Sequence, residues 1–231
     1  MKRTYIKYIL AIAISVAATS LYGQKKETRN LDDFTAISMG ISGDLHIKQG
    51  SKCEVIIEGD EETLAIIETS VTGDKLKIST KNSSWWKSYS KVNIYVTIKE
   101  FKGLSISGSG DANSDGFLKG ENVDLSVSGS GDISLDLEAS AIDCSISGSG
   151  SISLKGQGKT GHLTISGSGE LDAVDFELET LKIRISGSGS AEVYATKEID
   201  SHISGSGRVH YKGNPDKIVN HSSGSGSLKK M

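Results

Sequence analysis

The sequence predicts an all-β fold, a single-stranded, right-handed parallel β-helix, on three observations. A Ser-Gly-Ser-Gly motif recurs through the second half of the chain, apolar residues hold fixed positions relative to it, and apolar and polar residues alternate between its copies. The composition agrees, because 27 glycines against one proline suit a chain that turns often and in the same way.

The motif is the strongest of these signals. Its seven copies start 18 to 21 residues apart, at Ser107, Ser128, Ser147, Ser166, Ser186, Ser204 and Ser223. Regular similarity at this period is typical of a solenoid, in which each repeat forms one coil and stacks on the next. A β-propeller needs ~40–50 residues per blade, and a hairpin meander would place turns at alternate ends of its strands. A coiled parallel sheet is therefore favoured over both alternatives.

The positions around the motif predict which side chains lie inside the coil. The residue before it is apolar in six copies, namely Ile106, Val127, Ile146, Ile165, Ile185 and Ile203. Two further columns, which include Cys144 and Ile133, are also apolar in most copies. Between motifs the alternation has the period of two that a strand with one buried face requires, as at Ile133, Leu135 and Leu137. Polar residues at Ser201, Asn220 and Ser222 interrupt the columns, which predicts a polar cap at the C-terminal end.

The chain is expected to have three parts. Residues 1–23 are predicted to be a signal peptide, because a positively charged start precedes a short apolar stretch, with cleavage after Ser20 or Gly23. Residues 24–103 lack the motif but contain strand patterns at 45–47, 55–57, 76–78 and 92–98, and they are expected to form irregular opening coils or a strand-rich cap. The segments 42–44 and 72–74 resemble degenerate copies of the turn. Residues 104–231 are expected to form the repeat β-helix.

Charge and cysteine content limit the possible partners. The formal net charge is −3, from 26 basic and 29 acidic residues without a basic stripe, so nucleic acid is not an expected partner. Cys53 and Cys144 are the only cysteines and lack metal-ligand spacing. An oxidising compartment would permit a bridge between them, but Cys144 stands in an apolar column, so a buried free thiol is favoured.

The sequence offers few candidates for chemistry. Asp111 and Asp132 directly follow the motif in adjacent coils and could form a carboxylate pair of the kind used in glycoside cleavage. Tolerated surface charge is the favoured explanation of this pair. The five histidines have no metal-ligand spacing, so no metal or cofactor is expected. Trp85, Trp86 and Tyr89 lie among serines and lysines and are candidates for ligand contact or for a lid over the end of the coil.

The chain also resembles a known bacterial family. Phe34-Thr35-Ala36-Ile37, the turn at 42–45 and the serial Ile-Ser-Gly-Ser-Gly copies are similar to the auto-transporter adhesin head GIN domain, over about residues 30 to 228. The resemblance implies a pectin-lyase-like β-helix without catalytic residues, exported by bacteria and involved in adhesion.

Together with the predicted signal peptide, the resemblance leads us to expect a non-catalytic binding module in the periplasm, on the cell surface or secreted. Its expected partners are glycans or envelope and extracellular proteins. The alternative is a carbohydrate-active enzyme, a polysaccharide lyase or hydrolase, on the same coil.

Overall fold

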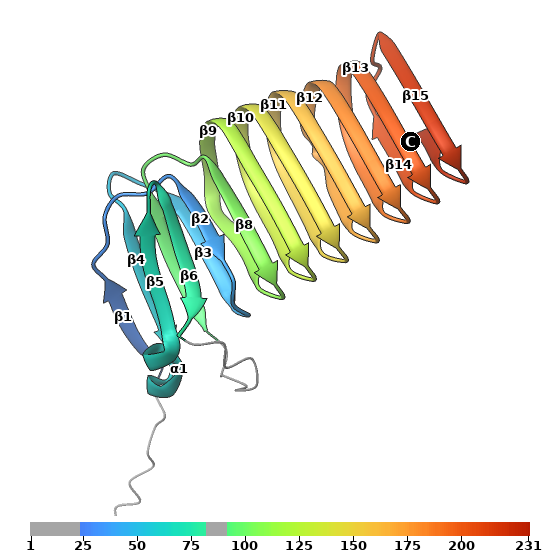
Figure 1. Cartoon of the computed structure of the whole chain (residues 1–231). Helices are drawn as coiled ribbons and strands as arrows, with labels where there is room; N and C mark the ends of the chain where they lie inside the picture. Colours follow the sequence, from blue (N-terminus) through green and yellow to red (C-terminus); the bar gives the residue numbers. More distant parts are fainter. Residues whose placement is uncertain (1–23, 82–91) are drawn as a thin grey trace, which may run out of the picture.

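The fold is a β-solenoid with a strand-rich N-terminal end, seen in a computed structural model that describes residues 24–81 and 92–231. Within these residues, sixteen strands form one sheet, and from residue 111 onward the order of its strands follows the coils. The coils stand side by side along one axis, and the C-terminus lies at the far end from the N-terminal part (Figure 1). The predicted parallel β-helix is confirmed.

The regular coils are formed by long, bent strands, each of which covers almost a complete turn. These strands are β9 (Asp111–Gly129), β10 (Asp132–Gly148), β11 (Ser151–Gly167), β12 (Glu170–Gly187) and β13 (Ser190–Gly205). Neighbouring coils pair in parallel and keep the motif in register, so that Ser147 pairs with Ser166 and Gly148 with Gly167. Equivalent residues are therefore stacked at the strand spacing of ~4.8 Å.

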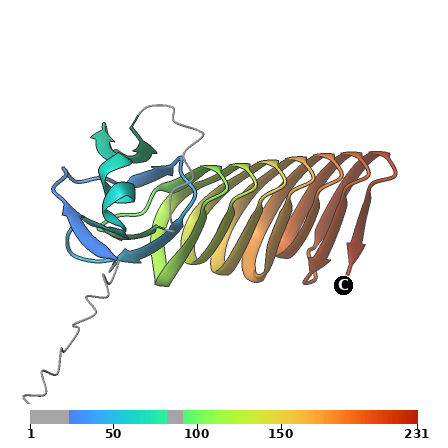
Figure 2. The same ribbon diagram turned by 90° about the horizontal axis from the view of Figure 1, so that it is seen from below.

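One coil shows how the sequence produces this shape. In β10 the side chains of Ile133, Leu135 and Leu137 are buried along the first half, and those of Ile142, Cys144 and Ile146 along the second. The two halves face each other across the core, as the flattened coils in Figure 2 show. Alternating apolar residues thus fill a continuous interior that runs from Phe34 to Val209.

The motif forms the turn that joins one coil to the next. Its first glycine has a positive φ in all seven copies, for example +124° at Gly148, a backbone region that side chains disfavour. Its second glycine is packed against the coil before it, because a Cβ on Gly150 would overlap the carbonyl oxygen of Gly131. Both glycines are thus required by geometry, whereas the two serines are exposed.

The N-terminal part continues the solenoid on one side and departs from it on the other. The parallel strands β2 (Ala36–Met39), β3 (Asp44–Gln49), β7 (Asn93–Ile98) and β8 (Gly103–Gly108) belong to the stacked sheet. The turn at Gly43 is stacked under the first motif, since its carbonyl accepts a hydrogen bond from Asp111 N at 2.9 Å. Strands β1 (Lys25–Arg29) and β4 (Glu54–Gly59) instead pair antiparallel.

Two features of this part differ from the sequence-based expectation. The segment 72–74 is not a degenerate coil turn but the tight connection of an antiparallel hairpin between β5 (Ile67–Thr72) and β6 (Lys75–Thr80). A short helix, α1 (Glu61–Ile66), precedes this hairpin and is capped by Asp60, whose carboxylate accepts a hydrogen bond from Thr63 N at 2.7 Å. No helix among the described residues is long and apolar enough to cross a membrane.

The C-terminal end closes with β14 (Arg208–Lys212), β15 (Lys217–Gly224) and β16 (Ser227–Lys230). Asn220 and Ser222 are exposed at the end of the coil, in positions that earlier coils fill with buried apolar side chains. Ser201, one coil earlier, is fully buried instead. The last coil therefore presents a largely polar surface at the open end, although Ile218 is 46% exposed there.

Candidate binding surface

The predicted aromatic contact residues cannot be placed. Trp85, Trp86 and Tyr89 fall in the segment 82–91, outside the residues that the structure describes. The predicted signal peptide, residues 1–23, also lies outside them. Both interpretations therefore stay predictions.

Asp111 and Asp132 are brought together as expected from the register. They are paired residues of the adjacent parallel strands β9 and β10, and both are exposed. Asp132 Oδ1 accepts hydrogen bonds from the Ser151 backbone N at 3.0 Å and from the Ser151 hydroxyl at 2.7 Å. The Asp132 carboxylate thus joins its coil to the next one by hydrogen bonds. The interpretation of this residue as surface charge did not include such a role.

Four of the five histidines have a ring contact or a nearby carboxylate. His46 stacks on Tyr95 with 5.0 Å between ring centroids, and Tyr95 donates a hydrogen bond to Glu58 that raises the pKa of the phenol. His210 Nδ1 lies 3.8 Å from Glu192 Oε1. His202 and His221 lie on neighbouring coils with their ring centroids 4.8 Å apart and their ring planes tilted by 33°. Throughout the described part of the chain, no group of three or more metal-ligating side chains comes together.

The two cysteines are free thiols. Cys144 is fully buried in its column, and burial raises the pKa of its thiol far above the usual range. Cys53 is half-buried near Phe34, to whose carbonyl oxygen its Sγ lies at 3.4 Å. The interpretation of Cys144 as a buried, unbridged thiol is confirmed.

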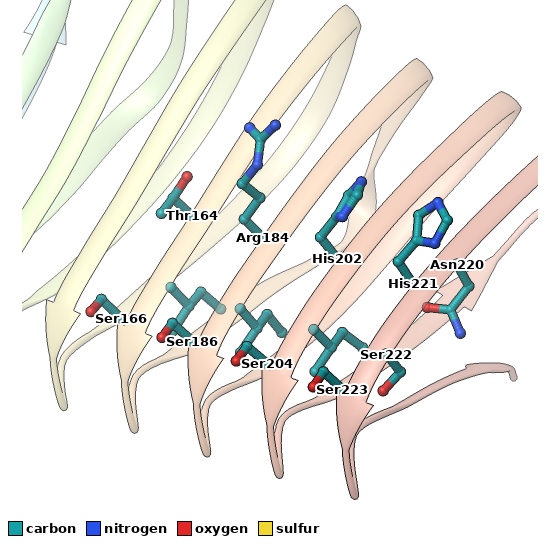
Figure 3. Close-up of a pocket in the computed structure, with 13 residues that line it drawn as sticks. Thr164, Ser166, Arg184, Ser186, His202, Ser204, Asn220, His221, Ser222 and Ser223 are labelled. Carbon is teal, nitrogen blue, oxygen red and sulfur yellow. The ribbon is translucent and has the colours of Figure 1, made fainter.

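A groove crosses the outer surface of the C-terminal coils, and it was not predicted from the sequence. We call it the C-terminal groove; it has a volume of about 730 Å³ and crosses the coils from β11 to β15. Figure 3 shows its side chains in two rows, both pointing out from the sheet. One row is Thr164, Arg184, His202 and His221, and the other is Ser166, Ser186, Ser204 and Ser223.

The groove follows directly from the strand period. Residues 164 and 166 face outward on either side of the buried Ile165, and the same relation holds around Ile185 and Ile203. Parallel register then places equivalent side chains of successive coils in rows. The residues between the rows form the floor.

The row that begins at Thr164 has larger side chains than the equivalent positions of the earlier coils. In the earlier coils the same register position holds Ser105, Ser126 and Ser145, and only from Thr164 onward do larger side chains follow. This change stands in the sequence two residues before each motif, at an exposed position between two buried columns.

The ionisable side chains that line the groove are all basic. Its lining contains Arg184, His202 and His221 but no aspartate or glutamate. Asp200 lies outside the lining, and its Oδ1 is 3.2 Å from His202 Nε2. Hydroxyl groups from six serine and threonine residues and one amide complete the polar part of the lining. The surface can therefore donate many hydrogen bonds to an anionic or hydroxyl-bearing ligand.

Comparison with known proteins agrees with this architecture. A family model described as "putative auto-transporter adhesin, head GIN domain" matches residues 33–215. The chain belongs to this family. The adhesin-head resemblance inferred from the repeats is thus confirmed, whereas a comparison with curated proteins found no match.

Several solved structures share the fold of this adhesin-head chain. A structure named as a putative adhesin from Bacteroides fragilis has 24% identity and a TM-score of 0.84, covering 90% of this chain and 97% of its own. One named as a putative lipid binding protein from Parabacteroides distasonis has 27% identity and a TM-score of 0.75, with the same coverage. A putative adhesin from Parabacteroides merdae has 23% identity and a TM-score of 0.72, covering 90% and 96%.

Proposed function

We propose that this protein is an exported, non-catalytic binding module whose rigid coil displays an extended surface to glycans or to envelope and extracellular proteins. Membership of the adhesin-head family is the observation that carries the proposal, and neighbours named as adhesins support it. Export rests on the signal-peptide pattern of residues 1–23.

The form of the molecule suits this role. The interior is filled by apolar side chains that are almost completely buried, so ligands have the outer faces available to them. Those faces carry polar side chains in register over many coils, and a surface with repeated groups suits contact with an extended partner. A lipid, as the name of the Parabacteroides distasonis neighbour suggests for that protein, would also have to bind outside the filled core.

The test is a binding screen of the mature chain against glycans and surface proteins. We expect saturable binding to at least one class, without change to the bound molecule. A chain that binds none of them would contradict the proposal.

The second candidate function is a polysaccharide lyase or hydrolase that uses Asp111 and Asp132. Their pairing in adjacent coils is the observation that favours it. Depolymerisation assays on acidic and neutral polysaccharides separate the two functions. Turnover that disappears in Asp111→Asn and Asp132→Asn would replace the binding module by the enzyme.

Trp85 and Trp86 are proposed as contact residues of the binding module. If they bind ligand, Trp85→Ala and Trp86→Ala should each weaken binding by ~1–3 kcal/mol and leave the melting temperature nearly unchanged. If they form a lid, truncation should instead cost ~3–5 kcal/mol of folding free energy. Thermal melts paired with binding titrations distinguish these results, and a large loss of stability in both variants would end the contact proposal.

A further inference from the structure

The C-terminal groove is lined by basic side chains and by no acidic ones. The protein as a whole is acidic, with a formal net charge of −3, yet the groove lining carries one arginine, two histidines and no carboxylate. The charged groups that surround it are mixed: Lys182 lies two residues before Arg184 on the same outer face, and Asp200 pairs with Lys182 in the register. Asp200 faces His202, and among the described residues neither Arg184 nor His221 forms an ion pair with a carboxylate.

A second hollow, at the opposite corner of the coils, provides a contrast. It has about 380 Å³ and is lined by Lys119, Lys159, Glu138, Glu177 and Glu179 among others. One of its lysines is paired with a carboxylate, since Lys119 Nζ lies 3.2 Å from Glu138 Oε2. Carboxylates around that hollow would repel an anion. Of these two hollows, only the C-terminal groove suits an acidic ligand.

The geometry of the groove also indicates the shape of its ligand. The rows run across four successive coils, so that donors recur at the strand spacing of ~4.8 Å. A linear ligand with repeated groups can contact several coils at once, whereas a single small anion would use only one. The guanidinium of Arg184 can bind a carboxylate or sulfate through two parallel hydrogen bonds. The serine row that begins at Ser166 offers hydrogen-bond donors and acceptors to the hydroxyl groups of a ligand.

We propose that the C-terminal groove binds an acidic polysaccharide, with Arg184, His202 and His221 contacting its carboxylate or sulfate groups and the serine row contacting its hydroxyls. The inference rests on the proposed binding function and names its site and ligand class. Nucleic acid fits less well, because the cations are few and do not form the basic stripe that a phosphate backbone requires.

The experiment compares binding of the mature chain to polygalacturonate, dextran sulfate and neutral dextran. Polygalacturonate carries carboxylates and dextran sulfate carries sulfates, so the two acidic probes distinguish the anionic groups. We expect binding to at least one acidic probe, weaker binding as salt is raised, and none to neutral dextran. Equal binding to neutral and acidic probes, or binding to neither acidic probe, would overturn the inference.

Two variants locate the site. Arg184→Gln should weaken binding of the acidic probe roughly tenfold, as expected from loss of one charged hydrogen-bonding partner, and adding His202→Asn and His221→Asn should weaken it further. Arg208→Gln is the matched control, because Arg208 is exposed at a position outside the groove lining, and it should stay within about twofold. All of these side chains are exposed, so thermal melts should match the wild type.

The control variant and the broad screen keep the two proposals separate. Undiminished acidic binding in Arg184→Gln and in the triple variant would overturn the groove as the site. Loss of acidic binding with Arg208→Gln to the same degree would show unspecific charge attraction and would also overturn it. Neither result affects the binding function, which fails only if the wild-type chain binds nothing in the screen of glycans and surface proteins.

Discussion

At the scale of single residues, the second glycine of the motif is a position where neighbouring coils lie too close for a side chain. Gly150 is buried, and a Cβ there would overlap Gly131 O of the preceding coil. Gly150→Ala should therefore destabilise the protein by about 2–4 kcal/mol, because backbone would have to move. Chemical denaturation measures the change. Ser149→Ala, one residue away and exposed, should change stability by less than about 0.5 kcal/mol. Equal effects of both variants would show that the close contact is not required.

Ser201 is a second residue with a defined energetic role. Its side chain is fully buried where earlier coils carry leucine, isoleucine or cysteine, and its Oγ has no hydrogen-bond partner among the described residues. A buried hydroxyl without a partner is destabilising. Ser201→Ala should consequently raise the free energy of unfolding by about 1 kcal/mol, measured by denaturant titration. Destabilisation would show that the hydroxyl is satisfied in the native protein.

At the scale of the strand, the buried columns hold the coils together. Ile146 is 1% exposed in the second half of β10, and Ile146→Asp would bury a carboxylate without a partner. The expected loss is about 3–5 kcal/mol of folding free energy. Ser147→Asp introduces the same charge at the next, outward-facing position and should be nearly neutral. A melting temperature of Ile146→Asp equal to that of the wild type would contradict the assignment of this face to the core.

The strands of the repeats could be predicted because the same positions relative to the motif are apolar in most copies. Ile133, Leu135 and Leu137 alternate with polar residues, and the alternation alone fixes which face is buried. The N-terminal elements offered no such repetition. The hairpin of β5 and β6 and the antiparallel pairing of β1 with β4 depend on contacts distant in sequence. The cap of α1, by contrast, had a local signal in Asp60 followed by two glutamates.

At the scale of the whole molecule, the solenoid converts a sequence repeat into rows of exposed side chains. The candidate residues chosen from the sequence, Asp111 and Asp132, were correctly expected to be neighbours because register follows from the motif. The C-terminal groove was missed, because Arg184, His202 and His221 become a group only when residues 18 to 19 positions apart are stacked. The change from serine to larger side chains appears only when the residues two positions before each motif are compared from copy to copy.

The proposed function, ligand binding without catalysis, is tested most directly by one measurement. The mature chain is incubated with polysaccharides of defined length, and the bound material is recovered and sized. The account predicts that at least one polysaccharide is retained with its chain length unchanged. Shortened chains that accumulate in proportion to protein and time would contradict it.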